Sequence, residues 1–171
     1  MIEMELGGLG FDPRNMSPIV LLRDKEERNF LPIWIGMFEA AAIAMELQEF
    51  KPPRPMTHDL ITAIIDEFGA KVDRVIINEI KDDTFYAVVK LTFDIEAGEE
   101  VLEDDIIEID ARPSDAIAIA VRTDAPIFVA ESVMLKAKMV NSEKDEEETK
   151  KFKRFVENVN PEDFIKYQNR E

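Results

Sequence analysis

Two stretches of this chain match each other well enough to predict an internal repeat. Residues 31–48 read LPIWIGMFEAAAIAMELQ, and residues 107–124 read IEIDARPSDAIAIAVRTD, an offset of 76 positions. In this alignment Glu39 stands over Asp115, and Ala40 stands over Ala116. A repeat gives both copies the same local structure, so a pattern that is ambiguous in one copy can be interpreted from the other.

The repeat decides between helix and strand for the second copy. Residues 116–121 alternate Ala with Ile or Val, a pattern that also fits a strand. Residues 38–50 of the first copy, in contrast, are rich in the strong helix formers Ala, Met, Glu, Leu and Gln. Pro113 stands where the first turn of a helix tolerates proline. We therefore predict strand, tight turn and helix in both copies, with Glu39 and Asp115 in the first helical turns.

The remaining patterns predict an α+β domain. Strands are expected at 2–9, 19–23, 72–80, 85–93 and 126–129, and helices at 57–68 and from 131 to about 138. Together with the repeat, these elements predict a twisted, mixed or antiparallel sheet with packed helices that contains a strand-turn-helix duplication. This domain is expected to span residues 1–140. Residues 141–171 are expected to be a charged linker and a C-terminal amphipathic helical tail, which docks on the body or on a neighbouring subunit.

Composition narrows the possible functions. A net charge of −16 opposes binding to nucleic acid or anionic lipid unless a basic patch or bound cations compensate for it. The absence of cysteine excludes disulfides, thiol nucleophiles and thiolate metal sites, and it fits the reducing cytoplasm. No apolar run approaches the roughly 20 residues that span a bilayer, so no membrane is expected. The phosphate-binding loops of nucleotide sites are also absent, and no nucleotide or organic cofactor is expected.

The paired acids of the repeat have two interpretations. If the two helix starts converge, Glu39 and Asp115 would present both carboxylates to one Mg²⁺ or Mn²⁺, as metal-assisted phosphodiester hydrolysis requires. Alternatively, each acid stabilises its own helix through the helix dipole and free N–H groups. Their distance apart in the fold separates the two interpretations.

Other candidate residues lie at the starts of two predicted helices. His58 is the only histidine, so an imidazole base or ligand has to be this residue; otherwise it is a surface residue next to Asp59. Arg54 follows two prolines and is a candidate to hold a phosphate or to pair with an acid. Arg112 opens the second repeat helix, where free N–H groups form a plausible anion site.

Three ordered segments resemble the signature segments of the bifunctional nuclease domain family. They are LPIWIG at 31–36 with Glu39 and Ala40, RPMTHDL at 54–60, and DARPSDAIA at 110–118. The resemblance covers roughly residues 1–138. It implies a nuclease that cuts DNA and RNA, and it nominates Glu39, His58, Asp59, Arg112, Ser114 and Asp115. The residues by themselves do not favour Ser114 as a nucleophile, since no second histidine and no nucleophile elbow accompany it.

The sequence is therefore compatible with two functions. The first is a metal-assisted nuclease, with Glu39 and Asp115 as metal ligands, His58, Asp59 and Ser114 as catalytic residues, and Arg54 and Arg112 as phosphate-binding residues. The second is a non-catalytic oligomeric binding or regulatory module in which the acids stabilise helices and apolar residues form subunit contacts. A homo-oligomer, with a dimer favoured, is expected under either function.

Overall fold

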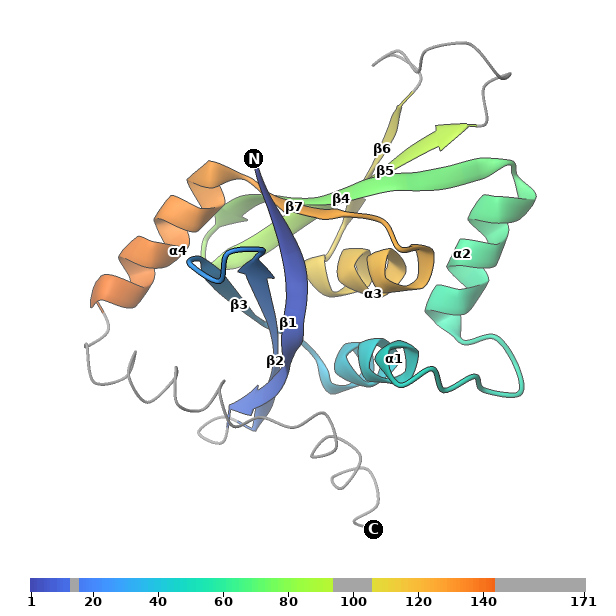
Figure 1. Cartoon of the computed structure of the whole chain (residues 1–171), viewed down its shortest axis with the longest axis horizontal. Coiled ribbons are helices and arrows are strands. Elements are labelled where there is room, and N and C mark those ends of the chain that lie inside the picture. The colour runs from blue at the N-terminus through green and yellow to red at the C-terminus, as the bar shows by residue number, and fades with distance from the viewer. Residues whose placement is uncertain (13–15, 94–105, 144–171) are drawn as a thin grey trace.

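The structure of this chain is a computed structural model that describes residues 1–12, 16–93 and 106–143, with side chains as far as residue 137. Within these described residues, seven strands form one mixed sheet and four helices accompany it (Figure 1). The strands are β1 Ile2–Asp12, β2 Ser17–Asp24, β3 Phe30–Trp34, β4 Ala70–Lys81, β5 Thr84–Phe93, β6 Ile107–Ala111 and β7 Ile127–Val129. The helices are α1 Met37–Leu47, α2 Thr57–Glu67, α3 Pro113–Thr123 and α4 Glu131–Glu143. The predicted α+β class is confirmed.

The strand order is β3-β2-β1-β7-β4-β5-β6. All neighbouring pairs are antiparallel except β4 and β7, which run parallel. The short strand β7 joins the two larger antiparallel groups because it pairs with β1 on one side and with β4 on the other. This late strand makes one continuous sheet from parts of the chain that are far apart in sequence.

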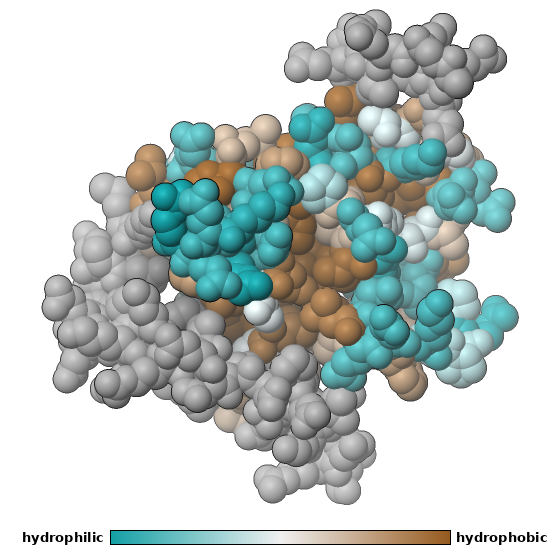
Figure 2. All heavy atoms as spheres, viewed as in Figure 1, coloured by the Kyte–Doolittle hydropathy of each residue, from teal (hydrophilic) through white to brown (hydrophobic). Residues whose placement is uncertain are grey.

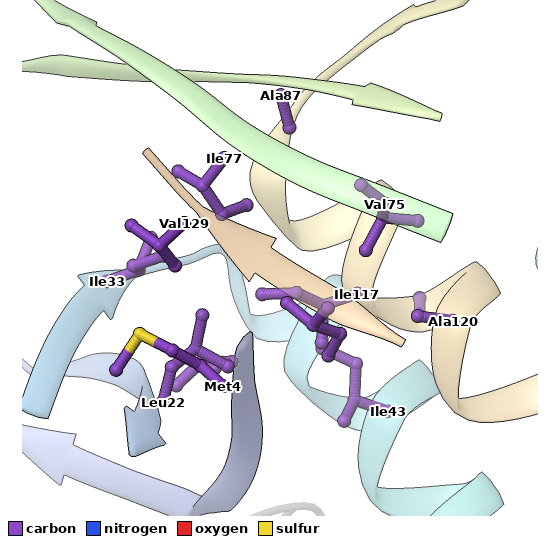
Figure 3. Close-up of a cluster of buried hydrophobic side chains, with 14 of the residues drawn as sticks. Met4, Leu22, Ile33, Ile43, Val75, Ile77, Ala87, Ile117, Ala120 and Val129 are labelled. Carbon is purple, nitrogen blue, oxygen red and sulfur yellow. The ribbon is translucent and has the colours of Figure 1, made fainter. Parts of the chain in front are cut away.

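Helix α3 lies at the centre of the helical layer. It packs against α1, α2, β4 and β5, and its small and branched side chains are almost completely buried. Figure 3 shows Ile117 of α3 and Ile43 of α1 in the same buried cluster as Val75 and Ile77 of β4. The alanines between the branched residues let the helices approach closely, which explains the Ala-Ile alternation that resembles a strand in the sequence.

The two predicted repeat copies occupy matching places in the fold. Each folds as a strand, a tight turn and a helix: β3 leads into α1, and β6 leads into α3. Their strands form the two opposite edges of the sheet, while their helices pack against each other. The strand-turn-helix structure of both copies is confirmed, and their origin by duplication stays a prediction.

Several local expectations need correction. The sequence places apolar residues almost all round this helix, which would predict burial between layers, but Phe38 is 89% exposed. Trp34 is half-exposed because β3 is an edge strand. The helix from residue 131 continues to Glu143, so the predicted linker begins inside α4, and the rest of the predicted tail lies outside the described residues. Figure 2 shows apolar side chains reaching the surface between hydrophilic regions.

The described helices are too short or too polar to cross a membrane.

Candidate functional site

The first turns of α1, α2 and α3 meet at one place in the molecule. Glu39 is the third residue of α1, His58 is the second residue of α2, and Asp115 is the third residue of α3. Arg112, the residue that precedes α3, binds Glu39 and Asp115, and Asp115 in turn binds His58. We call Glu39, His58, Arg112 and Asp115 the Arg112 cluster. The two acids matched by the repeat therefore meet at one site.

Arg112 joins the two carboxylates. Its Nη1 lies 2.8 Å from Oε1 of Glu39, and its Nε and Nη2 donate to the two carboxylate oxygens of Asp115 at 2.8 and 3.2 Å. The Arg112 side chain is 66% exposed, whereas both acids are largely covered. The guanidinium is thus fixed on the protein side and open on the solvent side, an arrangement suited to binding an external anion.

His58 contributes the buried side of the cluster. Its Nε2 lies 3.0 Å from Oδ1 of Asp115, and its side chain is almost completely buried. Because Asp115 also binds Arg112, it is ionised, and Nε2 of His58 must carry the proton of this hydrogen bond. The other ring nitrogen, Nδ1, is then the one that can accept a proton.

The electrostatics of the cluster favour an ionised Asp115. Burial raises the pKa of Asp115, but the hydrogen bonds from Arg112 and His58 lower it more, so the pKa of Asp115 lies below its ordinary value. The same hydrogen bond to Asp115, together with the charge of Glu39, raises the pKa of Arg112. The ion pair between Arg112 and Asp115 therefore stays charged over a wide pH range.

Gly36 leaves the space that the Glu39 carboxylate occupies. Gly36 precedes α1 in an extended conformation, and a Cβ atom built there would collide with Oε2 of Glu39. A larger residue at this position would push the flexible Glu39 side chain away from Arg112. In the repeat alignment Gly36 corresponds to Arg112. The first copy thus has a small residue at the position where the second copy has the arginine that binds both acids.

Asp59 is next to His58 in sequence but its carboxylate turns toward a different arginine. It accepts a hydrogen bond from Nε of Arg122 at 2.7 Å and another from the backbone N–H of Met56 at 2.8 Å. The hydrogen bond from Arg122 is the largest cause that lowers the pKa of Asp59, and burial only partly opposes it. Asp59 therefore fixes the start of α2, which carries His58.

Arg122 is the residue that the sequence analysis missed. Its side chain is only 5% exposed, and it also donates to the carbonyl oxygens of Ala118 and Ala42, at 2.8 and 3.0 Å. One guanidinium thus ties α3, where it originates, to α1 and α2. A signal was present in the sequence, because the repeat alignment places Arg122 over Glu46, and the two side chains lie 4.0 Å apart in the structure.

Two other nominated residues lie apart from the polar contacts of the cluster. Ser114 is buried at the start of α3 beside Asp115. Arg54 is exposed in the segment between α1 and α2, and among the described residues it forms no ion pair. The structure therefore joins Glu39, His58, Arg112 and Asp115, and leaves Arg54 outside this group.

The donor atoms suit a hard divalent cation, but their arrangement does not. Carboxylate oxygens are the ligands that Mg²⁺ and Mn²⁺ prefer. In the described part of the chain, however, no three acidic or histidine side chains are grouped as a cation would require. The guanidinium of Arg112 occupies the place between Glu39 and Asp115. In this arrangement the two acids hold an arginine instead of a metal ion.

Comparison with known proteins supports the resemblance found in the sequence. Residues 20–142 match the bifunctional nuclease domain family, a range that includes the whole Arg112 cluster. An uncharacterized protein of Mycobacterium tuberculosis is 39% identical, and the alignment covers 96% of this chain and 98% of that protein.

Two rice proteins extend the comparison to named relatives. "Bifunctional nuclease 2" of Oryza sativa subsp. japonica is 30% identical over 68% of this chain. "Bifunctional nuclease 1" of Oryza sativa subsp. indica is 30% identical over 65% of it. The alignments span only 34% and 32% of the two rice proteins. On the family match and its position over the cluster, the chain belongs to the bifunctional nuclease domain family.

Proposed function

We propose that this chain hydrolyses phosphodiester bonds of DNA and RNA at the Arg112 cluster. The observation that carries the proposal is the meeting of three helix starts around one solvent-facing guanidinium. The family supports a nuclease in particular, since the named rice relatives are called bifunctional nucleases.

Arg112 is the proposed phosphate-binding residue. The positive ends of three helix dipoles and the guanidinium favour an anion at this place, although the chain as a whole is strongly acidic. Glu39 and Asp115 hold the guanidinium so that its solvent side faces a backbone phosphate. Arg54, on the rigid proline-rich segment before α2, is proposed to contact a neighbouring phosphate.

His58 is the proposed general base and acid. Asp115 fixes the ring by accepting from Nε2, which leaves Nδ1 to take a proton from the attacking water. The water oxygen forms a bond to phosphorus, the bond from phosphorus to the leaving oxygen breaks, and His58 returns its proton to that oxygen. Asp59 is proposed to act indirectly, because its hydrogen bonds with Arg122 and the Met56 N–H fix the start of α2, which carries His58. Ser114, buried beside Asp115, is proposed to support the start of α3 in the same way.

A divalent cation remains part of the proposal only under one condition. Glu39 and Asp115 would hold Mg²⁺ or Mn²⁺, which would supply Lewis-acid stabilisation of the phosphate, but only after releasing Arg112. The proton transfers described for His58 do not depend on that ion.

The test is cleavage of single-stranded DNA and RNA by highly purified protein with Mg²⁺, with Mn²⁺ and with EDTA. Arg112→Met, His58→Gln and the double change Glu39→Ala with Asp115→Ala are each expected to abolish cleavage in folded protein. Arg28→Ala, which removes an exposed arginine paired with Glu26, is the matched control and is expected to cleave normally. Cleavage that survives all three changes in folded protein means the proposed site is wrong.

The same variants test the cation. Arg112→Met leaves the two carboxylates close together with no guanidinium between them, so it is expected to gain thermal stabilisation by Mn²⁺ relative to the unchanged protein. Cleavage by the unchanged protein in EDTA would support a cation-independent reaction. Cleavage that requires Mn²⁺ would support release of Arg112 during the reaction.

A non-catalytic oligomeric module is the second candidate, and one observation favours it. Leu60, Ile64 and Phe68 follow one another at helical spacing on α2 and its C-terminal end, and all three are exposed. Such a stripe is typical of a protein contact surface. Light scattering of the full chain and of Phe68→Glu, with Glu67→Gln as a control, would show whether this surface forms a dimer.

A further inference from the structure

The first turn of α1 carries an aromatic side chain that the described fold leaves bare. Phe38 is the second residue of α1 and is 89% exposed, the largest fraction among the large hydrophobic residues that the structure describes. It belongs neither to the main core cluster nor to the partly buried residues packed against that cluster. Single exposed apolar residues are common on protein surfaces. The neighbours of Phe38 therefore decide what its ring is suited to contact.

Phe38 is next to the Arg112 cluster. The residue that follows it, Glu39, binds Nη1 of Arg112 at 2.8 Å, and 66% of the Arg112 side chain is exposed. The Cα atoms of consecutive residues are only about 3.8 Å apart. The bare ring and the solvent-facing guanidinium therefore stand at one place on the surface.

Two methionines extend this apolar surface along the cluster. Met37, the first residue of α1, is 39% exposed. Met56 directly precedes α2, two residues before His58, and is 47% exposed. Neither belongs to the main core cluster of the described residues. We call Met37, Phe38 and Met56 the apolar rim. The rim borders the Arg112 cluster both at the start of α1 and at the start of α2.

A nucleotide whose base is unpaired matches this combination of groups. A phosphate is attracted to the guanidinium and to the positive ends of the helices. A nucleobase has a flat face that stacks on an aromatic ring, and a flexible methionine side chain adapts to the shape of its partner. In a duplex the bases stack on one another, so a protein meets only the phosphates and the edges of the bases in the grooves. The apolar rim is therefore of use only to a strand with unpaired bases.

We propose that the apolar rim binds an unpaired base next to the phosphate that Arg112 holds, and that the ring of Phe38 stacks on this base. The inference rests on the proposed function, because it takes Arg112 as the phosphate-binding residue. It makes single-stranded DNA or RNA the preferred substrate and Phe38 a substrate-binding residue. A second copy of the chain fits this place less well, since a symmetric contact through Phe38 would bring two exposed Arg112 guanidinium groups toward each other.

The test compares ligands that share a phosphate backbone but differ in their bases. Fluorescence anisotropy measures the binding of a labelled oligothymidine, of the same strand with abasic sites, and of the oligothymidine paired with oligoadenosine. The full chain carries His58→Gln in these measurements, so that binding is measured without cleavage. The matched control for Phe38 is Phe50→Ala, because Phe50 is 58% exposed beyond the opposite end of α1.

Phe38→Ala is expected to weaken the binding of oligothymidine about tenfold, because one base loses its stacking partner. The same change should leave the binding of the abasic strand and of the duplex unaltered. Phe38→Trp, which keeps an aromatic face, should bind oligothymidine at least as tightly as the chain with Phe38. Phe50→Ala should bind all three ligands normally. If Phe38→Ala weakens oligothymidine and the abasic strand equally, or weakens neither, the proposal is overturned.

Two further measurements separate this proposal from its alternatives. Arg112→Met is expected to weaken all three ligands, because each contains phosphate. If Arg112→Met changes none of them while Phe38→Ala still weakens oligothymidine alone, base binding by the rim is supported and the phosphate site of the proposed function is wrong. Light scattering of the unchanged chain and of Phe38→Ala tests the second copy. A dimer that Phe38→Ala dissociates would show that the ring contacts another copy, which contradicts the proposal.

Discussion

Replacing Arg122 by Met should strongly destabilise the fold, because one buried guanidinium joins α1, α2 and α3. The change removes the pair with Asp59 and the hydrogen bonds to the carbonyl oxygens of Ala118 and Ala42. Removing one partner of a buried ion pair costs about 3–5 kcal/mol. Since the Asp59 side chain is 27% exposed and water can partly replace its partner, we expect a loss of about 3 kcal/mol.

Chemical denaturation by urea is the assay for this prediction, with thermal unfolding beside it. A loss of about 3 kcal/mol corresponds to a melting temperature lower by about 6–12 °C for a chain of this size. Arg122→Lys should recover only part of the loss, because an ammonium cannot reach all three acceptors in the planar geometry of a guanidinium. Arg28→Ala, an exposed arginine, should cost less than about 1 kcal/mol.

Two results would refute this reasoning. If Arg122→Met costs no more than Arg28→Ala, Arg122 does not hold the helices together. If Asp59→Asn and Arg122→Met are additive in a double-mutant cycle, their 2.7 Å contact contributes no coupling energy.

Three further predictions concern Gly36, the carboxylates of Asp59 and Asp115, and Gly69. Gly36→Ala should change the free energy of unfolding by less than about 1 kcal/mol but lower the cleavage rate about tenfold or more, because the new methyl group displaces the Glu39 carboxylate. Equal cleavage rates for equal amounts of folded variant and unchanged protein would contradict this prediction. Acid should destabilise the fold, because the pKa values of Asp59 and Asp115 are lowered in the folded chain and unfolding therefore takes up protons. The stability that these two carboxylates contribute is fully present above about pH 5 and is lost as the pH falls through their folded pKa values. Urea midpoints from pH 7 to pH 3 test this, and Asp59→Asn with Asp115→Asn should flatten the dependence. Gly69→Ala should cost about 1 kcal/mol, since Gly69 has a φ of 69° with no atom near enough to clash, and Gly69→Asn should cost less; equal losses for both would argue against backbone strain.

Some parts of the fold follow from local chemistry that the sequence displays directly. Pro113 begins α3, where the backbone N–H that proline lacks would have had no partner. Gly69 follows the C-terminal end of α2 and adopts the left-handed backbone conformation that glycine favours there. The alternation of residues 85–93 predicted one covered side of β5 with Phe85, Ala87, Val89, Leu91 and Phe93 on it. Ala87, Val89 and Leu91 are buried, whereas Phe93, at the end of the strand, is 45% exposed. These features depend on interactions within a few residues, which a pattern in the sequence can show.

Burial at the edges was harder to predict. Phe38 has the composition of a core residue, but it lies on the side of α1 that no described element covers. Whether an apolar side chain is buried depends on which elements pack against it, and these come from distant parts of the chain. The same argument explains why Trp34 is half-exposed: β3 lies at the edge of the sheet.

The sequence alone determined that this chain has two matching strand-turn-helix units, each with an acid in its first helical turn, and a single histidine at the start of another helix. It also determined the family resemblance, which the comparison over residues 20–142 confirmed. Only the tertiary structure decided what the acids contact. It brought Glu39 and Asp115 to the same guanidinium and sent the carboxylate of Asp59 to the buried Arg122. The physical reason is that helix starts are set by local residues, whereas the partners of a charged side chain are set by packing between helices far apart in sequence.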